Sequence, residues 1–284
     1  MKLAVIGDEI SQDHELAVDT ARQLGFAAVE IRSAWETPPH QLGPEQLNAA
    51  KATVERAGLT VAGFAPPTFK HHLPRTDAEL AAARDMLVHT AGQAARLGAP
   101  HVRVFSFYRD EAPDPATAAK TVGLLLAGLR LPTPLVLETG TRTNTPTVEH
   151  AVRFLDELGR DDVGILWDPG NSVFSGWTES PFPHDYRLAK GLVRHVHVKD
   201  PDGTRAYVRL GDGALDWPAI LAALAADAYP GYVSLETHWR VDRELTAEER
   251  DNPWGSGFSA GGHEASVVCM QQLRSWLDRV GADV

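Results

Sequence analysis

The sequence predicts an α/β protein, built as a single (β/α)8 barrel over residues 1–284. Short apolar segments rich in β-branched residues recur roughly every 25 to 40 residues, and the gaps between them hold helical patterns. No linker rich in proline, glycine or serine divides the chain into two halves. The predicted strands are residues 3–6, 28–32, 60–65, 101–107, 135–138, 163–168, 194–199 and 232–236.

A doubly wound open sheet is the alternative arrangement of alternating strands and helices. Such a sheet calls for a glycine-rich turn after an early strand, whereas the turn after the first strand here reads Gly7-Asp8-Glu9. The sequence therefore favours the closed barrel.

Capping residues and prolines predict where the helices begin. Ser11 is the expected N-cap of the first helix, which ends at Gly25. Its expected inward face is Leu16, Ala17, Ala21 and Leu24. Further helix starts are expected at Pro44, Asp77, Asp114-Pro115 and Thr145-Pro146.

The composition limits the classes of partner. The chain is 43% hydrophobic, enough for a large core, and its net charge of −11 offers no general attraction to nucleic acid or an anionic membrane. Cys269 is the one cysteine, which excludes an internal disulfide and fits a reducing compartment. The apolar run 3–6 is too short for a signal sequence or a membrane span. We therefore expect a cytoplasmic protein, and the sequence leaves homo-oligomerisation open.

The seventh predicted strand carries polar side chains where a barrel interior is expected. Alternation places His195, His197 and Lys199 on one face and Val196 and Val198 on the other. Burying three polar groups costs free energy unless a metal, a charge or a hydrogen bond compensates each of them.

Four consecutive strands end in residues that can bind a metal. Glu138, Asp168, His197 and Glu236 each follow apolar β residues, at the strand ends that share one mouth of a barrel. Taken singly, each carboxylate could instead cap a helix or pair with an arginine, but four in succession outweigh that reading. Three carboxylates and one imidazole suit Mn²⁺ or Mg²⁺ better than a structural zinc.

At these residues the chain resembles the xylose-isomerase-like barrel superfamily, in particular its sugar phosphate isomerase/epimerase group. The resemblance also rests on Val29-Glu30-Ile31-Arg32, Arg103-Val104-Phe105-Ser106 and residues 210–217. It implies that Glu138, Asp168, His197 and Glu236 bind one divalent cation. We expect Mn²⁺ as first choice, with Mg²⁺, Co²⁺ or Zn²⁺ as alternatives. The resemblance also implies that Glu138 and Glu236 transfer protons, and that His195 is a neighbour of the site.

The chain departs from the group at Asn171. Many epimerases of the group have a histidine three residues after the aspartate ligand, and here that position is Asn171. Asparagine can donate a hydrogen bond to a substrate hydroxyl but cannot titrate. We therefore expect Asn171 to bind substrate without a proton-transfer role.

Other polar residues near strand ends are candidates for substrate contact. Lys199 could polarise a substrate oxygen, or could form a salt bridge with Asp200 or Glu236. Arg103, Arg205, Arg209 and His238 are the further expected substrate-binding residues. The alternative for the two loop arginines, Arg205 and Arg209, is simple solvation.

These expectations define a metal-dependent isomerase or epimerase of a sugar, ketose or polyol-derived ketone, working through a stabilised enediolate. One alternative is a dehydratase of a keto-polyol, similar to inosose dehydratase. Another is a sugar-binding barrel without catalysis, although binding alone does not call for the glutamate pair.

A long segment, about residues 239–262, follows the last strand. We expect it to be a lid over a small-molecule sugar or polyol substrate, because the loop is longer than ordinary barrel loops. The alternative is a phosphate site at Gly261, Gly262 and His263, where a helix begins. The inward face of that helix is expected to be Ala265, Val268, Gln272, Trp276 and Val280.

Overall fold

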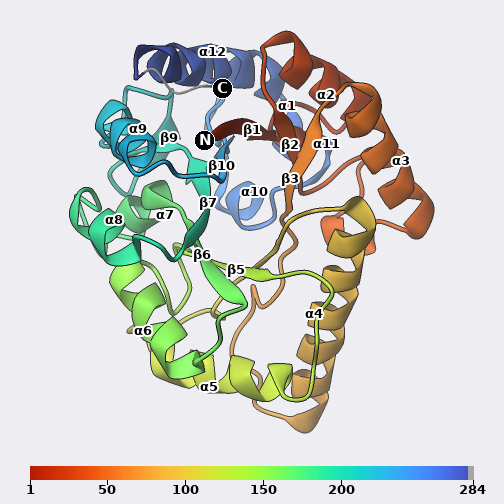
Figure 1. Ribbon diagram of the computed structural model, residues 1–284, viewed down its shortest axis with the longest axis vertical. Helices are drawn as coiled ribbons and strands as arrows, with labels where there is room; N and C mark the ends of the chain where they lie inside the picture. Colours follow the sequence, from red (N-terminus) through yellow and green to blue (C-terminus); the bar gives the residue numbers. More distant parts are fainter. Residues whose placement is uncertain (281–284) are drawn as a thin grey trace.

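The computed structural model describes residues 1–280 and confirms the closed parallel barrel (Figure 1). The strands close in the order β1-β10-β7-β6-β5-β4-β3-β2, and β8 and β9 form a separate antiparallel hairpin after β7. The bounds are β1 Lys2–Ile6, β2 Ala28–Ile31, β3 Thr60–Phe64, β4 Val102–Val104, β5 Leu135–Glu138, β6 Val163–Trp167, β7 Val193–Val198, β8 Asp200–Asp202, β9 Ala206–Val208 and β10 Tyr232–Leu235.

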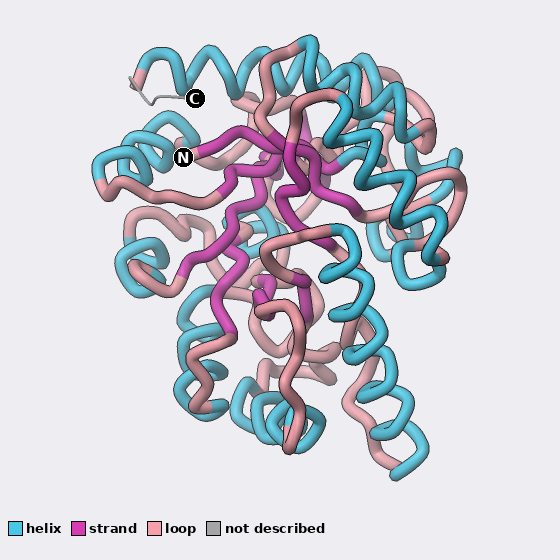
Figure 2. Tube along the Cα trace, turned by 45° about the vertical axis from the view of Figure 1, so that its right-hand side comes forward, coloured by secondary structure: helices cyan, strands magenta, loops and turns pink. Residues whose placement is uncertain are grey.

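Helices surround the strands on the outside of the barrel (Figure 2). Their bounds are α1 Gly7–Ile10, α2 His14–Gln23, a 3-10 turn Pro39–Gln41, α3 Pro44–Arg56, α4 Asp77–Leu97, α5 Pro115–Leu126, α6 Val148–Leu158, α7 Pro169–Phe174, α8 His184–Ala189, α9 Trp217–Ala226, α10 Ala247–Asp251, α11 Gly255–Ser259 and α12 Gly262–Arg279.

The core lies mainly between the strands and the outer helices. Val196 and Val198 of β7 pack there, as the alternation predicts, together with Trp167 of β6. Inside the barrel, small residues stand opposite large polar ones. A Cβ added at Gly63 would lie 2.5 Å from Nε2 of the buried His101, so glycine makes room for that ring.

The fourth strand is shorter than predicted. Only Val102–Val104 pair in the barrel, and β3 joins β4 through the single pair Phe64 and Val102. Phe105 instead donates its N–H to the carbonyl of Thr68, and Phe107 has a positive φ of 58°. The apolar run therefore continues into a loop over the mouth, because local β pattern alone does not reveal where a chain leaves the sheet.

Three predicted helix starts were wrong by one or two residues. The cap of α2 is Asp13, not Ser11, and its side chain accepts the N–H of Leu16. Leu16, expected to face inward, is 43% exposed. The cap of α4 is Thr76, in a capping box with Glu79, so Asp77 is the first helical residue.

Thr147, not Thr145, precedes α6. Thr145 is buried, and its hydroxyl bonds to the hydroxyl of Ser106 at 2.8 Å. The predicted starts at Pro44 and at Asp114-Pro115 are confirmed. The errors share one cause, because several residues in these turns can cap, and tertiary contacts select among them.

The inward face of α12 is rotated relative to the prediction. Ala265 and Trp276 are buried, but Val268 and Gln272 are only partly buried. The buried face includes Ser266, Cys269, Met270, Leu273 and Leu277.

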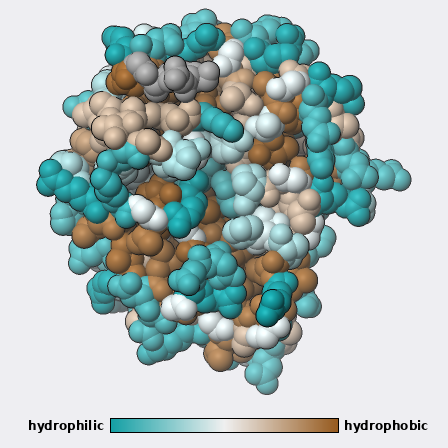
Figure 3. Space-filling view, in the orientation of Figure 1, coloured by the Kyte–Doolittle hydropathy of each residue, from teal (hydrophilic) through white to brown (hydrophobic). Residues whose placement is uncertain are grey.

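None of the described helices is long and apolar enough to cross a bilayer. The face in Figure 3 has hydrophilic residues around its periphery, with apolar ones interspersed.

Candidate metal centre and substrate cavity

Parallel pairing brings the four predicted ligands together at one mouth of the barrel. In the register of β7 and β10, Ser234 pairs with His197, so Glu236 follows two residues further on. The atom His197 Nδ1 lies 3.4 Å from Glu236 Oε2, 3.9 Å from Glu138 Oε1 and 3.9 Å from Asp168 Oδ2. One ligand atom from each of the four lies within 4.8 Å of all the others. All four side chains are buried.

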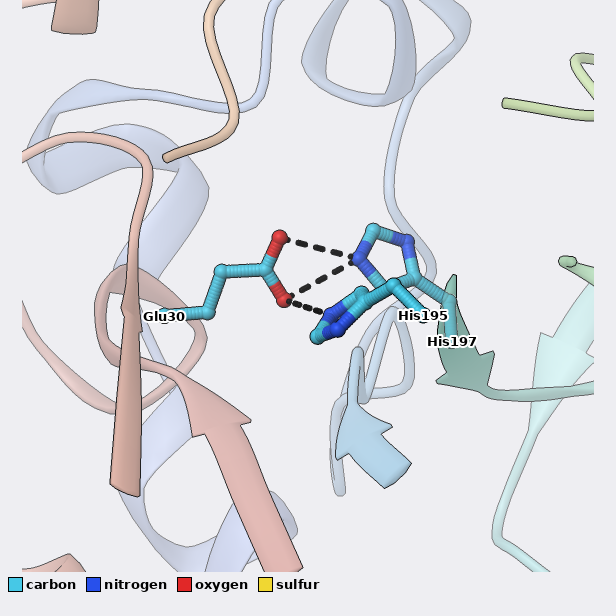
Figure 4. Close-up of side chains that lie close together, drawn as sticks. All are labelled: Glu30, His195 and His197. Carbon is cyan, nitrogen blue, oxygen red and sulfur yellow. Dashed lines mark hydrogen bonds and ion pairs between the residues drawn. The ribbon is translucent and has the colours of Figure 1, made fainter. Parts of the chain in front are cut away.

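The ring nitrogen Nε2 of His197, which faces away from the other three candidate ligands, is held by Glu30 from β2 across the barrel (Figure 4). Both Glu30 oxygens lie 3.1 Å from His197 Nε2, and one also lies 2.8 Å from His195 Nε2. Burial raises the pKa of Glu30, but His197 and His195 outweigh it and hold that pKa well below its usual range. A carboxylate on one ring nitrogen directs the other nitrogen toward a metal.

The residues present fit a divalent cation. His197 Nδ1 is buried, points into the cluster and has no hydrogen-bond partner. Burial lowers the pKa of His197, but Glu30 and Glu236 raise it to about 10, so without an ion the ring holds a proton beside the carboxylates. A cation would replace that proton, and three hard oxygen ligands with one imidazole suit Mn²⁺ or Mg²⁺.

Lys199 lies among the ligand carboxylates. Its ammonium is 2.8 Å from Asp168 Oδ2 and contacts Glu236 Oε2. Burial lowers the pKa of Lys199, but Asp168 and Glu236 raise it well above its usual range. The salt bridge with Glu236 is therefore present, whereas Asp200 faces away and accepts backbone N–H groups of the loop 211–215.

Glu138 is oriented by two of the expected substrate residues. Arg103 Nη1 lies 3.0 Å from Glu138 Oε2, and Asn171 Nδ2 donates to Glu138 Oε1 at 2.8 Å. Tyr207 in turn donates its hydroxyl to Asn171 Oδ1 at 2.9 Å. Sequence reasoning missed Tyr207, although an aromatic residue between Arg205 and Arg209 was the available signal.

Arg205 and Arg209 do not reach the cavity. Both side chains are exposed, and they pair with Asp202 and Asp212, each three residues away in the sequence. The structure thus brings Arg103 and Asn171 to the site, while it places these two loop arginines at the surface.

Glu236 is held by a buried network that sequence reasoning also missed. Arg32 Nη1 donates to Glu236 Oε1 at 2.6 Å, and Arg32 Nη2 donates to Asp8 and Glu9 at 2.8 Å. His238 completes the network, with its Nδ1 2.7 Å from Glu9 Oε1. The acidic pair of the Gly7-Asp8-Glu9 turn was the available signal, because two charged residues directly after a buried strand require partners.

A cavity of about 310 Å³ opens above this cluster. Its lining includes Glu138, Glu236 and Lys199. Of the expected substrate residues, Arg103, Asn171 and His238 also line it. The predicted lid contributes Ala247, Arg250, Asp251 and Pro253. The segment after β10 therefore covers part of the cavity.

The start of α12 packs against protein backbone. A Cβ added at Gly262 would lie 2.1 Å from the carbonyl oxygen of Glu9. The ring of His263 lies 3.3 Å from the hydroxyl of Thr20. Neither Gly261, Gly262 nor His263 lines the cavity, so the geometry favours the lid over the phosphate alternative.

A closed parallel barrel with polar side chains converging at its C-terminal mouth is the arrangement of (β/α)8 enzymes. The chain belongs to the xylose isomerase-like TIM barrel family, whose sequence profile matches residues 18–256. A curated relative, the rhizopine catabolism protein MocC of Rhizobium meliloti, is 35% identical over 112 residues. That match spans 33% of this chain and 33% of the relative.

Solved structures share the fold over nearly the whole chain. A D-psicose 3-epimerase determined in the presence of D-fructose has a TM-score of 0.75 at 18% identity, covering 99% of this chain and 100% of its own. The D-psicose 3-epimerase of Clostridium cellulolyticum H10, with D-tagatose, has a TM-score of 0.71 at 18% identity, covering 99% and 98%. The 3-keto-D-glucoside 4-epimerase YcjR of E. coli has a TM-score of 0.69 at 19% identity, covering 88% and 97%.

Proposed function

We propose that this protein is a divalent-metal-dependent isomerase or epimerase of a sugar, ketose or polyol-derived ketone. One observation carries the proposal: Glu138 and Glu236 face the same buried space beside His197 Nδ1, at the floor of a cavity. Membership of the xylose isomerase-like family and the sugar epimerases among the structural neighbours support it.

Glu138, Asp168, His197 and Glu236 would hold the cation, with Mn²⁺ as the first choice. A cation bound there would act as a Lewis acid on the substrate carbonyl and its adjacent hydroxyl. The protein supplies the orientation, since Glu30 fixes the ring of His197.

The two glutamates would move the proton. Each has a polar contact at both oxygens. Asn171 donates a hydrogen bond to Glu138 and Arg103 forms an ion pair with it, and Arg32 and Lys199 hold Glu236. One glutamate would remove the proton next to the carbonyl. The other would return it, to the opposite face in an epimerisation or to the neighbouring carbon in an isomerisation.

Dehydration of a keto-polyol is the second candidate reaction. Lys199 favours it, because its ammonium lines the cavity next to Glu236 and could protonate a departing hydroxyl. In that case the proton removed by a glutamate is not returned to carbon, and water leaves. The two candidates therefore differ in product mass.

The test is solvent exchange on the Mn²⁺-loaded protein with a panel of ketoses in D₂O. Deuterium at the carbon next to the carbonyl is expected in the product, detected by mass spectrometry and NMR. Glu138→Gln and Glu236→Gln should each reduce kcat by about 10²- to 10⁴-fold, because each removes the base while keeping its size. Glu149→Gln, on the exposed side of α6, is the matched control and should not change kcat.

Two outcomes would contradict the proposal. A near wild-type rate for Glu236→Gln with metal bound rules out the two-glutamate mechanism. Binding of sugars without exchange or turnover of any of them indicates the sugar-binding barrel instead. Loss of water mass from the product selects the dehydratase.

A further inference from the structure

The cavity above the metal centre is lined by twice as many cationic side chains as carboxylates. The cations are Lys70, Arg103, Arg109, Arg142, Lys199 and Arg250, and the carboxylates are Glu138, Glu236 and Asp251. The chain as a whole has the opposite balance, with 38 acidic and 27 basic residues. The lining of this cavity therefore carries an excess of positive charge on a chain that is acidic as a whole.

Three of the six cations are neutralised by the three carboxylates. Arg103 pairs with Glu138, Lys199 with Glu236, and Arg142 with Asp251. The remaining three are Lys70, Arg109 and Arg250, and none of them forms an ion pair with a carboxylate in the described part of the chain.

These three cations, which we call the mouth cations, are held by backbone carbonyls. Lys70 Nζ donates to the carbonyl of Asp251 at 2.5 Å, and Arg109 Nη1 donates to that of Thr141 at 2.6 Å. Arg250 donates to the carbonyl of Leu245. Each also lies over an aromatic ring: Phe105 for Lys70, Trp177 for Arg109 and Phe174 for Arg250. The carbonyl and the ring together fix the position of each mouth cation, while its other N–H groups stay free to bind a ligand.

The mouth cations come from three separate segments around the opening. Lys70 lies in the loop after β3, Arg109 in the loop after β4, and Arg250 in α10 of the lid. The metal centre lies at the buried end of the same cavity, where Glu138 is 2% exposed. Arg142, beside Arg109, has a side chain that is 55% exposed and marks the open end. The cavity therefore has a metal-binding floor and a cationic mouth.

The positive potential at the mouth affects the cations themselves. Burial and the neighbouring Arg103 lower the pKa of Lys70 to about 8. Burial and the neighbouring Arg142 lower the pKa of Arg109. A bound anion would relieve both effects, because it adds the missing negative charge where water is already partly excluded.

We propose that the substrate is an anionic polyhydroxy ketone, whose oxyanion group binds Lys70, Arg109 and Arg250 while its carbonyl end reaches Glu138 and Glu236. This inference rests on the proposed function and names its substrate class. A carboxylate and a phosphate ester share the required chemistry, since both accept hydrogen bonds from a guanidinium in pairs. A neutral ketose would leave three cations at the mouth without a counter-charge.

Three probes that differ only at carbon 6 test the proposal: D-fructose, D-fructuronate and D-fructose 6-phosphate. Their affinities for the Mn²⁺-loaded protein are measured by calorimetry at low and moderate salt. At least one anionic probe should bind ten-fold or more tightly than D-fructose, with a preference that decreases as salt increases. The tighter of the two anions identifies the group as a carboxylate or a phosphate.

Variants of the mouth cations separate recognition of the anion from binding of the sugar. Arg109→Gln and Arg250→Gln should each lower the affinity for the preferred anion about ten-fold. The affinity for D-fructose should stay within about two-fold of the wild-type value. Arg22→Gln, an exposed arginine of α2 paired with Asp19, is the matched control and should change neither affinity.

The binding readout does not depend on turnover. Tight binding of an anion that is lost in Arg109→Gln would support the inference. If the same protein shows no solvent exchange on any substrate, the proposed function is contradicted while the inference stands. Equal affinity for all three probes, no binding of any probe, or an anion preference that both variants retain would overturn the inference.

Discussion

Arg32 lies buried among three carboxylates, with hydrogen bonds to Asp8, Glu9 and Glu236. These contacts raise the pKa of the guanidinium despite its burial. The arginine therefore does two things: it compensates the buried negative charge, and it fixes one oxygen of a candidate catalytic glutamate. Removing a partner from such a network leaves uncompensated charge in a region of low polarity.

Arg32→Met should lower the free energy of unfolding by about 3 to 5 kcal/mol, because three carboxylates lose their shared cation while the volume is nearly kept. Urea unfolding followed by circular dichroism measures this change. The control is Arg22→Met, at a side chain that is 49% exposed, which should change stability by less than about 0.5 kcal/mol. A loss of less than 1 kcal/mol for Arg32→Met would show that the network does not depend on it.

We expect the buried carboxyl of Asp185 in α8 to make the free energy of unfolding depend on pH. Burial raises the pKa of its carboxyl from 3.8 to about 6, although the N–H of Val148 donates to it. The folded-state pKa lies above the unfolded value, so folding favours the protonated acid. That contribution is complete below about pH 3.8 and is lost as the pH rises through about 6.

Asp185→Asn should therefore stabilise the protein at pH 8, by about 1 to 2 kcal/mol, since asparagine stays neutral and can still accept the Val148 N–H. The gain should diminish on acidification and vanish near pH 4. Thermal unfolding across pH 4 to 8 measures it. A gain that is the same at pH 4 and pH 8 would contradict the raised pKa.

At the scale of elements, the short hairpin β8–β9 explains why Tyr207 enters the site and its arginine neighbours do not. Each strand of the hairpin is three residues long, and Pro201 pairs with Tyr207 at its centre. Arg205 already lies in the turn, where its N–H bonds to the carbonyl of Asp202. Residues at alternate positions share a face only inside a strand, so the alternation does not extend to Arg205 and Arg209.

The packing of α12 on α1 is a second feature at this scale that positions the site. Gly261 has a positive φ of 73°, and Gly262 approaches the carbonyl of Glu9 so closely that no Cβ fits. Glu9 also holds His238 and Arg32. The first turn of α12 thus supports the network behind Glu236.

Gly262→Ala should lower the free energy of unfolding by about 1 to 3 kcal/mol, because the added methyl group meets backbone that cannot move independently. The control is Gly257→Ala in α11, where an added Cβ meets no atom within 4 Å, and which should be neutral or slightly stabilising. Chemical unfolding of both variants provides the comparison. Equal stabilities would mean that α12 can shift away from Glu9 at little cost.

At the scale of the whole molecule, strands from both halves of the chain meet at the candidate metal centre. The candidate ligands lie on β5, on β7 and directly after β6 and β10. Glu30, on β2, contacts one of them, His197. An ion bound there would link these strands and bind only the folded state. Stability should therefore rise with metal concentration.

Mn²⁺ at about 100 times its dissociation constant should add about 2.7 kcal/mol to the free energy of unfolding. For a chain of this size, Tm should rise by roughly 5 to 10 °C, and EDTA should reverse the rise. His197→Gln should abolish the effect, and the exposed His263→Gln should retain it. An unchanged Tm with Mn²⁺, Mg²⁺, Co²⁺ and Zn²⁺ would contradict the metal centre.

The sequence by itself determined the barrel and the meeting of Glu138, Asp168, His197 and Glu236. Each strand is a local apolar pattern, and parallel strands in a barrel necessarily bring their C-terminal ends to one mouth. The helix starts were less certain, because serine, threonine and aspartate compete as caps within a few residues.

Only the tertiary structure decided the partners of these groups. Glu30 meets His195 and His197 across 165 and 167 residues, and Arg32 meets Glu236 across 204. Lys70, Arg109 and Arg250 likewise converge on one cavity from distant segments of the chain. Such contacts depend on how the barrel closes and where each loop folds back, and no local pattern of residues records that closure.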